Sequence, residues 1–340
     1  MSDDGGADEL QAPGGPVAAA VDAVLEASVV GGFSRIGFAA RRALRHWEPT
    51  GDLPRMDGRL AVVTGATSGI GRATALALAE LGASLVLVGR DQQRLDDVVA
   101  QCQQRAGEDA LVGGVRADLA DLDDAQHVVE AVRSAAEANR GAVDVLVHNA
   151  GALVHDRHVS DAGFEQTYAC QVLSPFLITT ELLPQLRASD DPRVIVVASG
   201  GMYTERLDAD AVQSLTGEWD GVRAYARAKR AQVELNAEWA ERVPDVTFAA
   251  MHPGWAETPG VLSSLPTFAR ITGRILRTPE QGADTVVWLA ATDEPRESGL
   301  FWLDRRPRST VRIPGTSTPE GERQALWSLV EHQTGMNSTN

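Results

Sequence analysis

The octapeptide TGATSGIG, residues 64–71, joins the apolar run RLAVVT (59–64) to the alanine-rich segment ATALALAELG (73–82). The first segment is typical of a buried strand and the second of a helix. Glycine between two such elements lets the turn tighten and lets a pyrophosphate approach the backbone. Free N–H groups at the start of the helix then favour the phosphate. The segment predicts a dinucleotide site whose contacts come from Gly65, Thr67, Ser68, Gly69, Ile70 and Gly71.

Alternation of apolar runs and helical segments continues from here towards the C-terminus. Strands are expected at 84–89, within 110–119, within 143–151, at 193–199, at 246–254 and near 299–304, and helices at about 91–107, 124–138, 164–187 and up to about 243. Continuous apolar strands that alternate with helices indicate a parallel sheet covered on both faces. We therefore expect the α/β class, a Rossmann-like doubly wound parallel sheet of about seven strands with helices on both faces.

Composition narrows the class of protein. The chain has 340 residues and a formal net charge of −16, which disfavours nucleic acid as a partner. It has two cysteines, Cys102 and Cys170, which exclude a disulfide scaffold and suit a reducing compartment. The acidic N-terminus lacks the positive charge of a signal peptide, and no apolar run reaches the length of a membrane span. We expect a cytoplasmic protein.

Three regions are expected along the chain. They are an N-terminal extension at 1–57, with 1–15 disordered and an amphipathic helix at 33–47, a dinucleotide-binding and catalytic domain at 58–305, and a C-terminal extension at 306–340. In the 33–47 segment, Phe33, Ile36, Leu44 and Trp47 recur at helical spacing among arginines. Such a stripe more often packs on the protein's own body or on a second subunit of a homo-oligomer, and contact with a membrane surface is the alternative.

The segment VRAYARAKRAQ, residues 222–232, is expected to be helical because alanine, arginine and glutamine favour helices. Positions i and i+4 share one helix face, so Tyr225 and Lys229 can meet there. A nearby positive charge favours the phenolate and so offers a general acid or base near neutral pH. Taken alone, the pattern is short and common, and it more often marks an extended lysine beside a half-buried tyrosine.

Five motifs in this order resemble the short-chain dehydrogenase/reductase family. They are TGxxxGxG at 64–71, HNAG at 148–151, a serine after the fifth strand, YxxxK at 225–229 and HPG at 252–254. The resemblance covers roughly residues 57–305, and the spacing of the first motif is that of the reductases and not of the sugar-nucleotide epimerases.

The resemblance implies hydride transfer between a nicotinamide cofactor and a small carbonyl or alcohol substrate. Tyr225 would be the proton donor, Lys229 would lower the tyrosine pKa and hold the nicotinamide ribose, and Ser199 would hydrogen-bond the carbonyl oxygen. Gln171 stands where the family has an asparagine that binds a water in a proton relay to the lysine. An apolar substrate is favoured because the residues near the expected pocket are mostly uncharged.

The resemblance also assigns the remaining cofactor contacts. Asp118 and Leu119 would meet the adenine, Asn149, Ala150 and Gly151 the adenosine ribose, and Pro253, Gly254 and Thr258 the nicotinamide carboxamide. Enzymes that prefer NAD usually end the second strand with an acid, but Gly89 stands there and Arg90 follows, where a guanidinium suits a 2′-phosphate. We expect NADP(H) to be preferred, with NAD(H) possible because Asp91 comes next, although Asp91 more simply caps the following helix.

The sequence also suggests a metal site and a role without catalysis. His148, His155 and His158 cluster in the sequence but lack a matched ligand pattern, so no metal is expected. The rival from another class is a nucleotide-binding scaffold or sensor that catalyses nothing. The Gln171 departure favours the rival, and the presence of Ser199, Tyr225 and Lys229 speaks against it.

Overall fold

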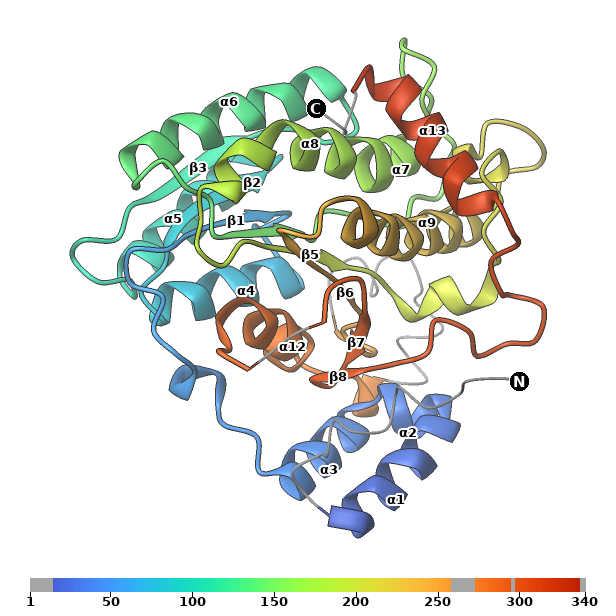
Figure 1. Cartoon of the computed structure of the whole chain (residues 1–340), viewed down its shortest axis with the longest axis horizontal. Coiled ribbons are helices and arrows are strands. Elements are labelled where there is room, and N and C mark those ends of the chain that lie inside the picture. Colours follow the sequence, from blue (N-terminus) through green and yellow to red (C-terminus); the bar gives the residue numbers. More distant parts are fainter. Residues whose placement is uncertain (1–14, 258–272, 295–296, 337–340) are drawn as a thin grey trace.

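At the centre of the computed structural model, which describes residues 15–257, 273–294 and 297–336, is an eight-stranded sheet of order β3-β2-β1-β4-β5-β6-β7-β8 (Figure 1). Neighbouring strands are parallel except for the antiparallel pair β7–β8. The strands are β1 Leu60–Thr64, β2 Ser84–Gly89, β3 Val112–Arg116, β4 Val145–His148, β5 Arg193–Val197, β6 Thr247–Met251, β7 Phe301–Leu303 and β8 Arg306–Pro307.

This sheet confirms the doubly wound α/β class and has one strand more than expected. The additional strand, β8, is two residues long and reads Arg-Pro, so no apolar pattern reveals it. The predicted disordered segment 1–15 and the predicted contact Thr258 lie outside the described residues, apart from Gly15, which begins a helix.

Helices cover both faces of the sheet. The helices α6, α8 and α9 share one apolar core with one face, and α4, α5 and α12 share another with the opposite face (Figure 1). Beyond α9, α13 packs its Trp327 ring 4.8 Å from that of Trp239. The bounds are α4 Gly69–Glu80, α5 Gln92–Gln103, α6 Leu122–Ala138, α7 Gln166–Tyr168, α8 Ser174–Arg187, α9 Gly221–Arg242, α12 Pro279–Ala291 and α13 Glu322–Thr334. Within the described part of the chain, no helix combines the length and the apolar character that crossing a bilayer requires.

The helix expected at 164–187 is interrupted. It starts as α7, continues as a π turn at Ala169–Leu173 and becomes regular again as α8. Pi turns occur mostly as single turns inside helices, often at functional sites. Sequence spacing did not reveal it, because most residues of the turn, the polar Gln171 among them, are buried as in a regular helix that faces the core.

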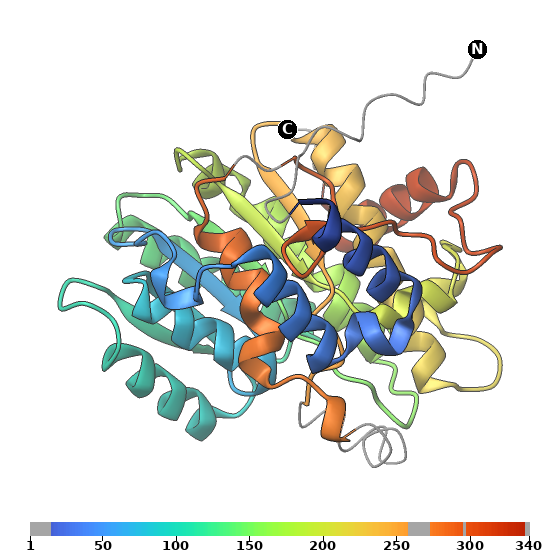
Figure 2. The ribbon, with the colours of Figure 1, turned by 90° about the horizontal axis from the view of Figure 1, so that it is seen from below.

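The N-terminal extension folds as α1 Gly15–Ala27, α2 Val29–Phe33 and α3 Arg35–Arg45, and lies beside β7, β8 and α12 (Figures 1 and 2). The segment 33–47 holds the helix α3, which is shorter than expected because the extended backbone of Ser34 separates it from α2 and Phe33. The break shifts the helical phase, so Phe33 and Phe38 are buried while Ile36 is 62% exposed. Docking on the protein's own body therefore does not use Ile36.

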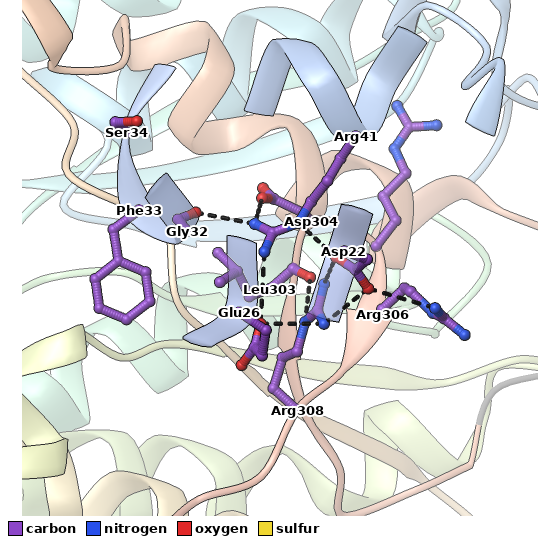
Figure 3. A network of polar contacts seen from close by, with 12 residues as sticks. Asp22, Glu26, Gly32, Phe33, Ser34, Arg41, Leu303, Asp304, Arg306 and Arg308 are labelled. Carbon is purple, nitrogen blue, oxygen red and sulfur yellow. Dashed lines mark hydrogen bonds and ion pairs between the residues drawn. The ribbon is translucent and has the colours of Figure 1, made fainter. Parts of the chain in front are cut away.

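Buried ion pairs hold these helices against the end of the chain (Figure 3). Arg41 bonds Asp22 through Nε at 2.7 Å and Asp304 through Nη1 at 2.6 Å. Asp304 also accepts from Arg277 at 2.6 Å, and Asp22 from Arg308 at 2.9 Å. Burial alone would raise the pKa of Asp304, but Arg277 and Arg41 together hold it below its usual range. We call Asp22, Arg41, Arg277, Asp304 and Arg308 the terminal ion-pair cluster.

The extension also reaches the segment that follows β6. The carbonyl of Phe33 accepts a hydrogen bond from the backbone N–H of Trp255 at 2.8 Å. The Phe33 ring meets His252 edge-on, with centroids 4.3 Å apart. His252 precedes Pro253 and Gly254, so the N-terminal helices support the backbone of a predicted cofactor contact.

Candidate active site

The glycine turn after β1 packs closely against the segment that follows β4. Gly65 has a φ of +65°, and a Cβ at this position would lie 2.8 Å from Ala150 Cα. A Cβ on Gly71 would lie 2.3 Å from Asn149 Nδ2. That amide nitrogen donates to the carbonyls of Thr64 and Gly65 at 3.0 and 3.1 Å and so fixes the turn. Ser68, at the N-cap of α4, makes no side-chain capping bond, which leaves the helix N-terminus suited to an anion.

A cavity of about 1260 Å³ lies over this turn, at the carboxyl ends of the parallel strands. In a doubly wound sheet this is where ligands bind. All the predicted cofactor and catalytic residues that the structure describes line it: Gly65, Thr67, Ser68, Gly69, Ile70, Gly71, Arg90, Asp118, Leu119, Asn149, Ala150, Gly151, Gln171, Ser199, Tyr225, Lys229, Pro253 and Gly254. The structure therefore brings together residues spread over 190 positions of the chain, from 65 to 254.

Tyr225 and Lys229 lie one turn apart on α9, which Asp220 caps by accepting from the N–H groups of Val222 and Arg223. Lys229 is the only lysine in the sequence. Its Nζ is 5.4 Å from the centre of the Tyr225 ring and donates to the carbonyl of Val197 at 2.9 Å. This bond holds the ammonium at the end of β5, where both residues line the cavity.

Ser199 follows β5 and faces Tyr225. Its Oγ accepts from the N–H of Gly201 at 3.2 Å, which caps a short 3₁₀ turn, and it also hydrogen-bonds the Tyr225 side chain. Ser199 therefore has both a capping contact and a contact with the phenol. A hydroxyl held between these groups is placed to bind an oxygen that the phenol also reaches.

The pKa directions at the site differ from the sequence expectation. Burial raises the pKa of the Tyr225 phenol, and the hydrogen bond with Ser199 lowers it only in part. Burial lowers the pKa of Lys229 to about 8. The expectation that the pKa of this phenol lies below its ordinary value is therefore wrong for this structure, because desolvation is the largest influence on the buried side chain. A phenol with a raised pKa stays protonated at neutral pH, as a proton donor must.

Gln171 lies in the π turn and is fully buried. Its Nε2 donates to the carbonyl of Ala152 at 3.3 Å, and its Oε1 has no hydrogen-bond partner among the described residues. The backbone carbonyl of Gln171 accepts from Gln232 Nε2 at 2.7 Å. Gln232 in turn accepts from Lys229 at 3.0 Å through Oε1. Sequence reasoning missed Gln232, although its spacing of three residues from Lys229 on one helix face was a signal.

At the other end of the cavity, Arg90 is largely exposed and lies 3.8 Å from Asp118. The β2–β3 register places Arg116 beside Gly89, so a second guanidinium borders the cavity. The sequence did not indicate this arginine as a cofactor contact. Asp91 caps α5 by accepting from the N–H of Arg94 at 3.1 Å, as expected. His148 is buried at the end of β4, where burial lowers its pKa to about 3.

The fold and this cavity define a class, the nicotinamide-dependent α/β oxidoreductases. Residues 59–208 match the model of the short chain dehydrogenase family. The chain is 37% identical over 280 residues to human dehydrogenase/reductase SDR family member 12, and the alignment covers 82% of this chain and 86% of that protein. It is 33% identical to mouse polyprenol dehydrogenase, over 83% of this chain and 86% of that one.

A solved structure agrees with these relatives. L-sorbose reductase from Gluconobacter frateurii, complexed with NADPH and L-sorbose, superposes with a TM-score of 0.55 and 25% identity, over 70% of this chain and 91% of that one. The chain belongs to the short-chain dehydrogenase/reductase family. It is an oxidoreductase that acts on CH–OH or C=O groups with a nicotinamide cofactor.

Proposed function

We propose that the protein is an NADP(H)-dependent reductase or dehydrogenase of an apolar carbonyl or alcohol, with Tyr225 as the proton donor. The observation that carries this proposal is the meeting of Ser199, Tyr225 and Lys229 in the same cavity as the glycine turn. The glycine turn lines the same cavity as these three residues, and the uncapped N-terminus of α4 behind it suits a pyrophosphate. The two cysteines of the protein, Cys102 and Cys170, form no disulfide, which fits an enzyme that acts in a reducing cytoplasm.

The chemistry divides between the cofactor and the protein. When bound, the nicotinamide supplies or accepts the hydride. Ser199 holds the substrate oxygen, and Tyr225 donates its phenolic proton to that oxygen during reduction. Lys229 places a positive charge beside the phenolate that forms, which is charge stabilisation in a buried site. Because the Tyr225 pKa is raised, the reducing direction has its proton in place at neutral pH.

The preference for NADP(H) rests on the end of β2. Gly89 has no side chain to bind a ribose 2′-hydroxyl, and a Cβ there would lie 2.3 Å from Thr67 Cγ2, so an acid would have to displace the Thr67 side chain. Arg90 is exposed at the cavity edge, and Arg116 adds charge beside it. A guanidinium fits a phosphate through paired hydrogen bonds.

Arg90→Ala is expected to weaken NADPH binding by about 1.5–3 kcal/mol, the range for a hydrogen bond to a charged group. NADH binding should barely change, because NADH has no 2′-phosphate. Titration of both reduced cofactors into wild type and variant, followed by protein fluorescence, measures both affinities. Wild-type protein that binds NADH as tightly as NADPH would refute the preference.

An apolar substrate is proposed from the lining around Ser199 and Tyr225, where Ala152, Val154 and Ala256 border the cavity. Mouse polyprenol dehydrogenase, a relative by sequence, is named for an apolar alcohol. A panel of apolar and polyhydroxylated carbonyls, followed by the absorbance of NADPH, tests the proposal. Turnover restricted to polyhydroxylated substrates would overturn the apolar assignment.

A further inference from the structure

The environment of Lys229 contains a contact that the proposed chemistry leaves unexplained. Lys229 Nζ lies 3.0 Å from Gln232 Oε1, and Gln232 Nε2 lies 2.7 Å from the backbone carbonyl of Gln171. All three residues are at most 4% exposed. One carboxamide therefore connects the ammonium to the peptide carbonyl of the π turn. By the family resemblance, a bound water would make this connection.

The direction of both bonds follows from their partners. An ammonium only donates and a carbonyl only accepts, so the oxygen of the Gln232 amide must face Lys229 and its nitrogen must face Gln171. If the amide rotated by 180°, its nitrogen would face the Lys229 ammonium, which also only donates, and its oxygen would face the Gln171 carbonyl, which also only accepts. A buried mismatch of this kind costs the full desolvation of each group, so the side chain is locked in one orientation.

This locked amide has an electrostatic effect on Lys229. Burial lowers the lysine pKa, and the amide oxygen opposes that shift by accepting a hydrogen bond from the charged form. The titratable side chains that face the ammonium are Tyr225, one turn earlier on α9, and Cys170, from the π turn. The end of β5 contributes the carbonyl of Val197. The ammonium therefore depends for its charge on two neutral acceptors, the Val197 carbonyl and the Gln232 amide.

We propose that Gln232 is a positioning residue that takes the place of a bridging water, holds Lys229 in its charged form and fixes the ammonium against the π turn. The proposal rests on the function proposed above. A carboxamide does not exchange protons as water does, so Tyr225 regains its proton through the open cavity and not through the Gln171 carbonyl.

The single lysine of the chain makes the charge of Lys229 directly measurable. Protein labelled with ¹⁵N-lysine has one side-chain nitrogen signal, whose shift against pH reports the Lys229 pKa. Gln232→Leu removes the acceptor and should lower this pKa by about one unit or more. Gln232→Glu adds a negative charge in the same place and should raise it. Asn236→Leu is the matched control, because Asn236 is a buried amide one turn further along α9 and its side chain has no partner among the described residues.

Kinetics supply the second readout. If Lys229 must be charged and its pKa falls from about 8 to about 7, Gln232→Leu loses about fivefold in kcat/KM at pH 8 and close to tenfold at pH 9, but almost nothing at pH 6. A purely structural role would give one loss at every pH. Opposite pKa shifts in the Leu and Glu variants, with Asn236→Leu unchanged, support the proposal.

Equal pKa values in wild type and both Gln232 variants would overturn this inference even if the wild type is active. Wild-type protein that turns over no carbonyl or alcohol with either cofactor would instead overturn the proposed function. In that case the NMR titration still reports whether Gln232 sets the charge of Lys229.

Discussion

Tyr225→Phe is expected to lower kcat by about 10²–10⁴ while leaving the affinity for NADPH nearly intact. Phenylalanine keeps the ring that packs over Lys229 but removes the hydroxyl that bonds Ser199. The proposed acid is then missing. The other hydroxyls among the described residues that line the cavity belong to serine and threonine, which are much weaker acids than a phenol. Steady-state rates on a substrate from the carbonyl panel, with cofactor binding measured separately, give both quantities.

Tyr203→Phe is the matched control for this experiment. Tyr203 is buried, and its hydroxyl bonds the carbonyl of Ser309 at 3.0 Å, outside the residues that line the cavity. Its loss should reduce stability and leave kcat close to that of the wild type. A Tyr225→Phe protein that kept most of the wild-type rate would show that the phenol is not the acid.

Asp304→Asn is expected to lower the free energy of unfolding by about 3–5 kcal/mol, because it leaves Arg41 and Arg277 as buried charges with too little opposing charge. Asparagine has almost the same shape, so the loss reports charge and not packing. The melting temperature should fall by an amount on the order of 5–15 °C. The aspartate contributes stability above its ordinary pKa and loses it as the pH falls, so the difference from wild type should shrink below about pH 4.

Asp57→Asn provides the comparison at the surface. Asp57 accepts two hydrogen bonds from Arg55, at 2.7 and 3.0 Å, but both side chains are more than half exposed. Solvent screens exposed pairs of this kind, so Asp57→Asn should leave the melting temperature close to that of the wild type. Similar losses in the two variants would contradict the importance of burial in the terminal ion-pair cluster.

The parts of the site that were predicted from the sequence are local. The glycine turn is a run of eight residues whose conformational demands are visible in their types, and Tyr225 and Lys229 are one helical turn apart. Parallel strands then bring their carboxyl ends to one edge whatever the loops contain. For this reason almost every predicted contact lines the same cavity.

The parts that were missed depend on contacts between distant segments. Gln232 matters because a π turn presents the Gln171 carbonyl to it, 61 residues away. The break at Ser34 is a single residue with extended backbone between α2 and α3, and helical periodicity does not record it. Burial of the Tyr225 phenol reversed the expected direction of its pKa shift, because desolvation depends on the whole fold and not on residue spacing.

The terminal ion-pair cluster also has a consequence for the order of synthesis. Arg41 and Asp304 are 263 residues apart. At typical translation speeds, roughly half a minute separates the emergence of α3 from that of its aspartate partner. Throughout that interval the first three helices carry arginines and apolar side chains whose final neighbours do not yet exist. A nascent chain stalled before residue 304 should therefore leave helices α1, α2 and α3 open to proteases and chaperones, while in the completed chain these helices are protected.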